Sequence, residues 1–353
     1  MFRINLFAIF PLILGCPTAV NASDHSTDVV DVIAFGSCVH QDHEQPIWKA
    51  INAENADLFV LLGDNIYGDT EDMAVLQAKY QKLGSNAGFQ QLRASTPLVA
   101  VWDDHDFGRN DGGGAYPKKA ASRQIMLDFF EEPADSPRRT QEGGIYTSYE
   151  YGPPGQRVQL ILLDLRWNRG TLERVGAVQN QTTRVPRRMG PYKAHKDDKQ
   201  PFLGEAQWRW LEAQLEKPAD IRIIGSSLQF IPEFTGWESW ANFPHARNRL
   251  LKLLRDKETT GAVVISGDTH WSEFSRLERE DTYPLTEVTS SGLTEEWRWV
   301  SPNKHRVGEP YSKANYGLIK IDWAGDATRI HLSVRDVTGQ VVREQTLALS
   351  QLQ

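Results

Sequence analysis

Leu58-Phe59-Val60-Leu61-Leu62-Gly63-Asp64-Asn65-Ile66-Tyr67 joins a short apolar run directly to a glycine, a carboxylate and a phenol. An apolar run of this length is typical of a strand that is buried on both faces of a sheet. Five more such runs lead into hydroxyl, thiol or carboxylate side chains, at residues 30–35, 98–102, 158–163, 221–225 and 262–265. Open α/β sheets bind ligands beyond the carboxyl ends of their strands. The repetition therefore predicts an α/β protein with a metal site at that edge, which makes the chain a candidate enzyme.

Helical patterns lie between these runs, at residues 71–83, 120–130, 205–216 and 247–257, and Asp69 and Thr70 are candidate caps of the first helix. Alternation of strand and helix predicts mainly parallel sheets in a layered α/β fold. The last part of the chain differs, because glycine-containing turns join strand-like segments over about residues 316–347. This pattern predicts an antiparallel meander that completes a second sheet.

Composition excludes several classes of protein. The 353 residues, 40% of them hydrophobic, suffice for a large core in one or two domains. The net charge of −7 argues against nucleic-acid binding, which normally requires a basic surface. Beyond the N-terminal segment, the sequence has no apolar stretch of the roughly 18 residues that a membrane-spanning helix needs.

The N-terminal residues have the pattern of an export signal. Arg3 precedes an apolar segment, and Val20-Asn21-Ala22 is a small-residue cleavage site. We therefore expect residues 1–22 to be a signal peptide and the mature protein to be secreted or periplasmic. The alternative is a lipoprotein signal, in which Ile13-Leu14-Gly15 precedes a lipid anchor at Cys16 on the membrane surface.

Cys38 is the cysteine that remains once this signal is removed. A single thiol in an oxidising compartment is unusual. It is either an inert core residue or a thiolate protected by a metal. Its position directly after a predicted strand favours the metal.

Asp64 and Tyr67 are the first candidate ligands. A carboxylate at the end of a strand can bridge two cations, and a phenolate three residues later can bind the same ion. Phenolate favours a hard, acidic ion such as Fe³⁺. Gly63-Asp64-Asn65 is also compatible with an ordinary turn.

Asp103-Asp104-His105-Asp106 places three carboxylates in four residues after a buried strand. These carboxylates repel one another unless a cation lies between them. His105, with Asp106 as its orienting partner, fits a general acid or a stabiliser of transition-state charge better than a ligand. The glycine-rich loop that follows could bring Arg109 and Asn110 to a phosphate.

Asp268 and His270 follow the last predicted parallel strand, two residues apart. Both can face one ion if the backbone turns there. Residues 169–199 lack periodicity and carry eight Lys and Arg against three Asp and Glu. This basic insertion is either a solvated loop or a rim that attracts an anionic substrate.

Together these motifs resemble the alkaline phosphatase D (PhoD-like) group of the metallophosphatase, or calcineurin-like phosphoesterase, superfamily. The resemblance covers about residues 33–322. It rests on several motifs in order: Gly-Ser-Cys at 36–38, Gly-Asp-x-x-Tyr at 63–67, Trp-Asp-Asp-His-Asp at 102–106, Asp-x-Arg-x-x-Arg at 164–169 and Ser-Gly-Asp-x-His at 266–270. It implies a single domain over residues 23–353, expected to be a monomer, with a four-layer α/β/β/α sandwich of two mixed sheets.

The resemblance also implies a multinuclear centre of Fe³⁺ and Ca²⁺. Cys38, Asp64 and Tyr67 would hold the iron, and Asp64 would bridge to a site that includes Asp104. Asp268 and His270 would complete the centre. Asp104 and Asp268 replace the Asn and His that are usual in the wider superfamily, which favours oxygen-preferring cations.

The implied reaction is hydrolysis of a phosphoester by a metal-activated hydroxide. His105 would act on the leaving group, oriented by Asp106, while Arg166 and less directly Arg109 and Arg169 would clamp phosphoryl oxygens. The substrate could be a monoester or a diester, including a lipid or nucleotide ester in a groove of tryptophans at 237, 240, 297 and 299. A non-catalytic exported metal-binding protein and a redox enzyme are the alternatives.

Overall fold

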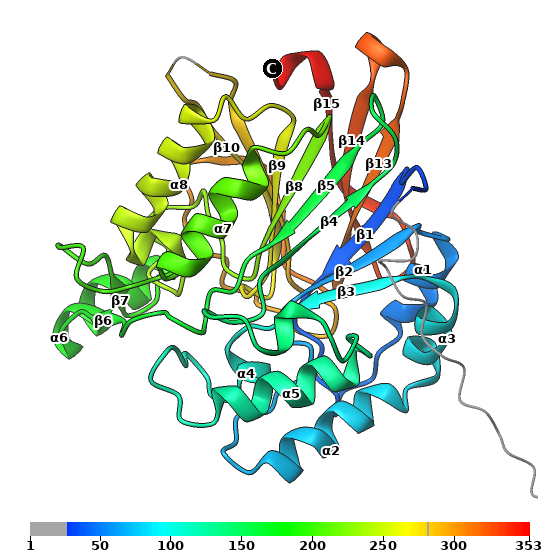
Figure 1. Cartoon of the computed structure of the whole chain (residues 1–353). Coiled ribbons are helices and arrows are strands. Elements are labelled where there is room, and N and C mark those ends of the chain that lie inside the picture. The colour runs from blue at the N-terminus through cyan, green and yellow to red at the C-terminus, as the bar shows by residue number, and fades with distance from the viewer. Residues whose placement is uncertain (1–26, 281) are drawn as a thin grey trace, which may run out of the picture.

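The computed structural model describes residues 27–280 and 282–353, so the expected signal at 1–22, with Cys16, lies outside the described residues. Two large mixed sheets pack face to face, and helices lie on their outer sides (Figure 1). The predicted four-layer α/β/β/α sandwich is confirmed. None of the helices in the described ranges has the length and apolarity to cross a bilayer.

The first sheet combines the first strands of the chain with the last. Its order is β15-β14-β13-β1-β2-β3, in which β1, β2 and β3 are parallel and the last three strands form an antiparallel meander paired to β1. The meander is as predicted, but it extends the sheet of β1 and does not complete the other one. The bounds are β1 (Val32–Gly36), β2 (Leu58–Leu62), β3 (Leu98–Val101), β13 (Asn315–Asp322), β14 (Arg329–Asp336) and β15 (Val341–Ala348).

The second sheet has the order β12-β10-β11-β9-β8-β5-β4. Its central strands β5, β8, β9 and β11 are parallel, and antiparallel strands flank them. The bounds are β4 (Thr147–Tyr151), β5 (Val158–Leu162), β8 (Ile221–Ser226), β9 (Ala262–Ser266), β10 (Ser272–Leu277), β11 (Leu285–Ser290) and β12 (Arg306–Tyr311).

Helices α2, α5, α7 and α8 agree with the four predicted segments to within a few residues, and α1, α3, α4 and α6 were not predicted. Asp72, not Asp69 or Thr70, caps α2, because its side chain accepts hydrogen bonds from the backbone at Ala74 and Val75. The bounds are α1 (Ile47–Ala53), α2 (Met73–Gly84), α3 (Ala87–Ser95), α4 (Asp104–Phe107), α5 (Lys119–Phe129), α6 (Ala177–Gln179), α7 (Glu205–Leu215) and α8 (Pro244–Asp256).

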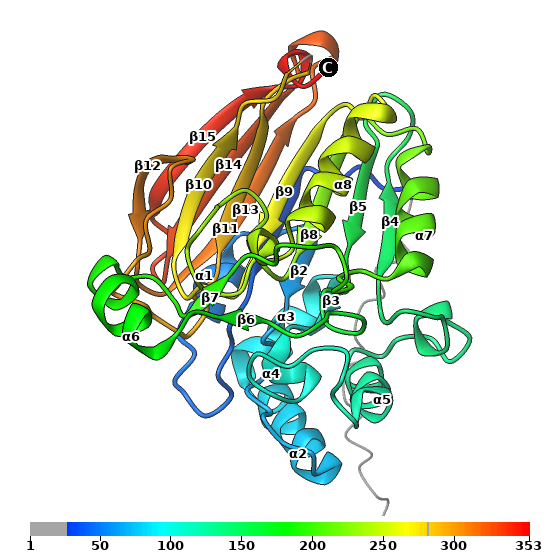
Figure 2. The same ribbon diagram turned by 90° about the vertical axis from the view of Figure 1, so that its left-hand side faces the viewer.

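The basic insertion is more ordered than a solvated loop. It contains α6 and the antiparallel pair β6 (Glu173–Arg174) and β7 (Tyr192–Lys193). It lies at the same end of the sandwich as α4 (Figure 2). This is the end at which the parallel strands finish.

The core lies between the sheets and under the outer helices. Strands β2, β5 and β9 are buried at every position, because one face meets the opposite sheet and the other meets helices. The loops after the parallel strands meet beyond this core, as the backbone hydrogen bonds Cys38 N–Gly63 O (3.3 Å) and Gly267 N–Ser227 O (3.2 Å) record. The sandwich thus gathers six chain segments at one edge.

A substitution at Gly317 tests the packing where the meander pairs with the parallel strands. Gly317 pairs with Phe35 across β13 and β1, and a Cβ atom there would lie 2.2 Å from the buried Phe35 ring. We expect Gly317→Ala to lower the free energy of unfolding by about 1–3 kcal/mol, because a buried ring must shift. Urea unfolding measures this value. Gly176→Ala, where the added Cβ would have no neighbour within 4 Å, is the control and should be near neutral; equal effects would contradict the packing argument.

Candidate metal centre

The turn after β2 places Asp64 at the centre of the gathered loops. Gly63 has φ +97°, and a Cβ atom there would lie 2.5 Å from Asp103 Cβ, so glycine lets the loops after β2 and β3 touch. The backbone carbonyl of Asp64 accepts a hydrogen bond from Val39 N at 2.7 Å, which ties the loop after β1 to the same turn. Asp64 is 1% exposed.

Four of the six predicted ligands have left-handed backbone conformations. The φ angles are 65° at Cys38, 49° at Asp64, 71° at Asp268 and 62° at His270. Such angles are uncommon outside glycine and cost about 1–3 kcal/mol each. They persist where the surrounding structure enforces them, which happens most often at functional sites. The strain is therefore evidence for the site that is independent of side-chain type.

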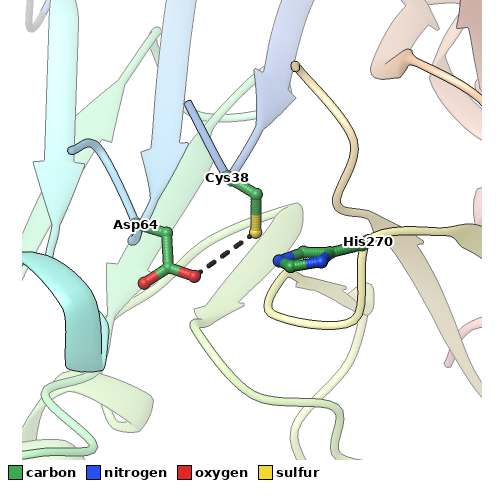
Figure 3. Close-up of side chains that lie close together, drawn as sticks. All are labelled: Cys38, Asp64 and His270. Atoms are coloured by element: carbon green, nitrogen blue, oxygen red, sulfur yellow. Dashed lines mark hydrogen bonds between the residues drawn. The ribbon is translucent and has the colours of Figure 1, made fainter. Parts of the chain in front are cut away.

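Cys38, Asp64 and His270 point toward one another (Figure 3). Cys38 Sγ lies 3.4 Å from Asp64 Oδ2, and Tyr67 Oη lies 2.9 Å from His270 Nε2. Ser291 Oγ holds this group together, because it contacts Cys38 Sγ at 3.2 Å and accepts a hydrogen bond from His270 N at 2.9 Å. Three loops and a strand end thus bring thiol, carboxylate, phenol and imidazole side chains into one cluster.

Asp64 also belongs to a second group, with Asp103, Asp104 and Asp268. One carboxylate oxygen of each lies within 4.8 Å of those of the others. The residue that the sequence singled out as a bridge is therefore shared by the thiol-containing group and the carboxylate group.

A third group went unpredicted. Asp104, Asp111 and Glu238 also place ligand atoms within 4.8 Å of one another. Asp111 stands in the glycine-rich loop, which was considered only for its arginine and amide. Glu238 follows β8 by twelve residues, without any local pattern around it. The only available signal for Glu238 was that β8 ends at the same edge as the other strands.

These groups carry more negative charge than the protein neutralises. Burial, followed by the charges of nearby acidic groups, raises the pKa of Asp64 and Asp268 well above the ordinary value. Burial also raises the pKa of the Cys38 thiol to about 12. Cations would stabilise the ionised forms of all three.

The donor set fits such cations. Among the described residues, none donates a hydrogen bond to the buried Asp104 Oδ1. Burial, followed by the charge of His105, lowers the pKa of His270 to about 4, so this imidazole is neutral and able to ligate. Sulfur, phenol, imidazole and carboxylate donors therefore lie in overlapping groups, and the guanidinium of Arg166, 3.7 Å from Asp104 Oδ1, pairs with that oxygen without a hydrogen bond.

His105 is held by Asp69, and the prediction that Asp106 orients it is wrong. His105 Nδ1 lies 2.7 Å from Asp69 Oδ2. Asp106 is buried and accepts hydrogen bonds from the backbone of Asp103 at 2.7 Å and of Asn65 at 3.2 Å, so it fixes the turn into α4. Burial lowers the pKa of His105, but the carboxylates of Asp104 and Asp69 outweigh it and raise the pKa to about 9. The imidazole is therefore protonated at neutral pH.

None of the three arginines that were predicted to clamp phosphoryl oxygens lines the cavity above the metal-binding groups. The guanidinium of Arg166 is fully buried. It donates hydrogen bonds to both carboxylate oxygens of Asp103 at 2.7 Å and to Glu238 at 2.6 Å. Arg169 lies 3.0 Å from Glu238. Arg109 is exposed outside the cavity. Of the predicted substrate-binding residues only Asn110 reaches the cavity wall.

The cavity above the metal-binding groups has a volume of about 230 Å³. No lysine or arginine of residues 27–280 and 282–353 lines it. Its walls consist of Asp64, Asp104, His105, Asn110, Asp111, Trp237, Glu238, Asp268, Thr269, His270, Trp271 and Trp297.

Solved structures share the fold of this sandwich. "Structure of PhoD" superposes with a TM-score of 0.68 at 18% identity, over 92% of this chain and 69% of that one. A dimetal phosphatase from Danio rerio gives 0.54 at 15% identity, over 92% of this chain and 100% of that one. GAP50, the anchor in the inner membrane complex of Plasmodium, gives 0.57 at 15% identity, over 91% and 89%. At these identities the likeness establishes the fold alone.

The family follows from sequence. Residues 33–316 match the model of the PhoD-like phosphatases, and the chain belongs to that family. Alkaline phosphatase D of Bacillus subtilis (strain 168) is 24% identical over 284 residues, which are 69% of this chain and 46% of that protein. The chain thus spans about half the length of this curated relative. The resemblance drawn from the motifs is confirmed.

Asp69 should set the charge of His105. In the metal-free protein we expect the His105 ring to titrate with a pKa of about 9. Asp69→Asn should lower that pKa, because a neutral amide no longer stabilises the imidazolium. Titration of the imidazole signals by NMR measures it. Asp106→Asn is the comparison: it should leave the pKa of His105 unchanged while lowering stability, and the reverse pattern would restore Asp106 as the orienting residue.

Proposed function

We propose that this chain is an exported metal-dependent phosphoester hydrolase. The main observation behind this proposal is the buried cluster of carboxylate, thiol, phenol and imidazole groups that opens into the cavity beside His105. Membership of the PhoD-like phosphatase family supports the reaction class. Export rests on the sequence of residues 1–22.

Two neighbouring sets of ligands suit two kinds of cation. Tyr67 and Cys38, with Asp64, favour Fe³⁺, because phenolate and thiolate stabilise an acidic trivalent ion. Asp104 and Asp268, which share Asp64, offer only oxygen and favour Ca²⁺. When bound, these cations would supply Lewis acidity toward the phosphoryl group and a nucleophile derived from water at neutral pH.

His105 would protonate the leaving group. It lines the cavity, and its Nδ1 is held by Asp69, whose carboxylate favours the protonated ring. Hydrogen bonding through Nδ1 leaves the other ring nitrogen for the departing oxygen. Asp69 is thus a positioning residue, and His105 is the residue proposed to touch the reacting atoms.

The arginines would act through the carboxylates. Arg166 donates to Asp103 and Glu238, so it fixes their oxygens below the cavity floor. A monoester is a dianion at neutral pH and gains from fixed positive charge, but no lysine or arginine of the described residues lines the cavity beside His105. A diester carries a single negative charge. This arrangement favours phosphodiesters over phosphomonoesters as substrates.

The alternative is a non-catalytic metal-binding protein. The same fold occurs in the Plasmodium anchor protein GAP50, so fold does not decide the question. A metal-binding role requires Cys38, Asp64 and Tyr67 but not a protonated histidine in the cavity wall. The geometry of His105 and Asp69 favours catalysis.

Asp64→Asn tests the metal centre. We expect the metal-loaded wild type to hydrolyse bis(para-nitrophenyl) phosphate faster than para-nitrophenyl phosphate. The variant should lose more than about a hundredfold in kcat, since even residues that only support metal ligands can cost that much. Elemental analysis should show metal loss. Asp322→Asn is the control. The Asp322 side chain is 73% exposed and lies at the end of the sheet that is opposite to the metal-binding groups. Near-normal turnover by Asp64→Asn would remove the bridging role.

His105→Gln separates catalysis from metal binding. Removal of a general acid lowers kcat by about a hundredfold or more. Because His105 is proposed not to ligate, the metal content should equal that of the wild type. The loss should be smaller for esters of acidic phenols than for alkyl esters, which need protonation more. Metal loss in this variant would instead identify His105 as a ligand, and unchanged kcat would exclude it as the acid.

A further inference from the structure

A second cavity adjoins the metal cavity and shares its wall. It has a volume of about 590 Å³, and Trp237 and Trp297 line both cavities. Trp299 and residues of the basic insertion, among them Asn180 and Arg188, complete it. We call it the tryptophan groove. A molecule with its phosphate over the metal-binding groups can therefore extend into the groove past two indole rings.

The groove is held in shape by hydrogen bonds between its two walls. Gly190 N donates to Thr235 O at 3.1 Å, beside the loop that carries Trp237. Ser301 Oγ donates to the backbone carbonyl of Arg188 at 2.6 Å, beside the segment that carries Trp299. The insertion is thus fastened to both tryptophan-bearing segments, and the groove is formed before a ligand arrives.

Indole rings and a guanidinium lie close to one another along the groove. The rings of Trp237 and Trp297 meet nearly edge to face, at 5.8 Å and 83°. Trp297 Nε1 donates to Trp299 O at 3.1 Å, and the Arg188 guanidinium lies 5.5 Å from the Trp299 ring centre. Trp299 is nevertheless 60% exposed. Val185, which lines the same groove, is 53% exposed, so the two side chains form an exposed apolar patch of the kind that marks ligand-binding surfaces.

We propose that the tryptophan groove binds the nucleoside substituent of a phosphodiester whose phosphate occupies the metal cavity. This inference rests on the proposed function. Indole faces and a guanidinium plane stack on planar rings, and such stacking accepts any nucleobase. Polar residues, Asn180 and Arg188, also line the groove, and a nucleobase offers hydrogen-bonding groups to such a wall, whereas an alkyl chain offers none.

The test compares three diesters with the same leaving group. These are the thymidine, methyl and octyl esters of para-nitrophenyl phosphate, assayed with metal-loaded protein. The wild type should prefer the thymidine ester in kcat/KM. Trp299→Ala should lower that value about tenfold, within the range measured for loss of one stacked ring, and leave the methyl ester nearly unchanged. Trp299→Phe should restore most of the loss.

Phe234→Ala is the matched control. Phe234 is 58% exposed, like Trp299, but does not line the groove, so its removal should not alter the preference. Equal kcat/KM for the thymidine and methyl esters would overturn the proposal. A preference for the octyl ester that Trp299→Ala removes would also overturn it, in favour of an acyl-binding groove.

A binding measurement keeps this result separate from the proposed function. Saturation-transfer NMR with thymidine alone should show contact with the wild type and with Phe234→Ala, and much less with Trp299→Ala. If metal-loaded protein cleaves no diester but this pattern holds, the groove stands and the proposed hydrolase activity fails. If diesters are cleaved but thymidine shows no contact dependent on Trp299, the groove proposal fails alone.

Discussion

The buried pair between Arg166 and Asp103 is the interaction on which the site depends. Arg166 follows β5 and Asp103 follows β3, so the pair joins the two sheets at their carboxyl ends. Ser227, after β8, donates to the same carboxylate at 2.5 Å. Removing one partner of a buried pair leaves an uncompensated charge and costs about 3–5 kcal/mol. Every loop that carries a candidate ligand is anchored directly or through one neighbour to this pair.

That anchoring explains how strained ligands persist. The left-handed angles at Cys38, Asp64, Asp268 and His270 each oppose folding. Strands β2 and β9 are fully buried and β1 is buried at four of its five positions, and their packing fixes where each loop starts. Backbone hydrogen bonds between loops then fix where each one turns. The stability of the sandwich is thus used to hold acidic groups together at distances that they would not adopt alone.

Sequence predicted what local pattern encodes. All six apolar runs are strands, since a strand buried on both faces requires continuous apolar sequence. The meander was assigned to the wrong sheet. It pairs with β1, and strands that pair from opposite ends of the chain leave no local pattern in the sequence. Asp64, Cys38 and His270 stood out because each directly follows such a strand. Glu238 lies well beyond the end of β8, and no local sequence pattern marks it as a candidate ligand.

The arginines show the limit of motif reasoning in physical terms. Asp164, Arg166 and Arg169 occur at a spacing suited to binding an anion, and an arginine pairs equally well with a phosphate or a carboxylate. Only the three-dimensional structure distinguishes these two partners, and in it Arg166 donates hydrogen bonds to the carboxylates of Asp103 and Glu238. The roles of the ligands in catalysis are likewise set by the metals, which the sequence does not contain.

The excess of acidic groups around the cavity also bears on the order in which cations and substrate would bind. Carboxylates of Asp64, Asp104, Asp268 and Glu238 surround the cavity, and the two nearest arginines already pair with acidic groups. In the metal-free protein, burial raises the pKa of Asp64 and Asp268, so these groups take up protons and an anion gains little there. On the proposed function, bound cations would displace these protons and supply the positive charge for an anionic substrate, and the loss of the protons is an energetic penalty at the metal site. The exposed tryptophan groove carries no such penalty, because an aromatic group is neutral, so contacts there are available to the protein in either state.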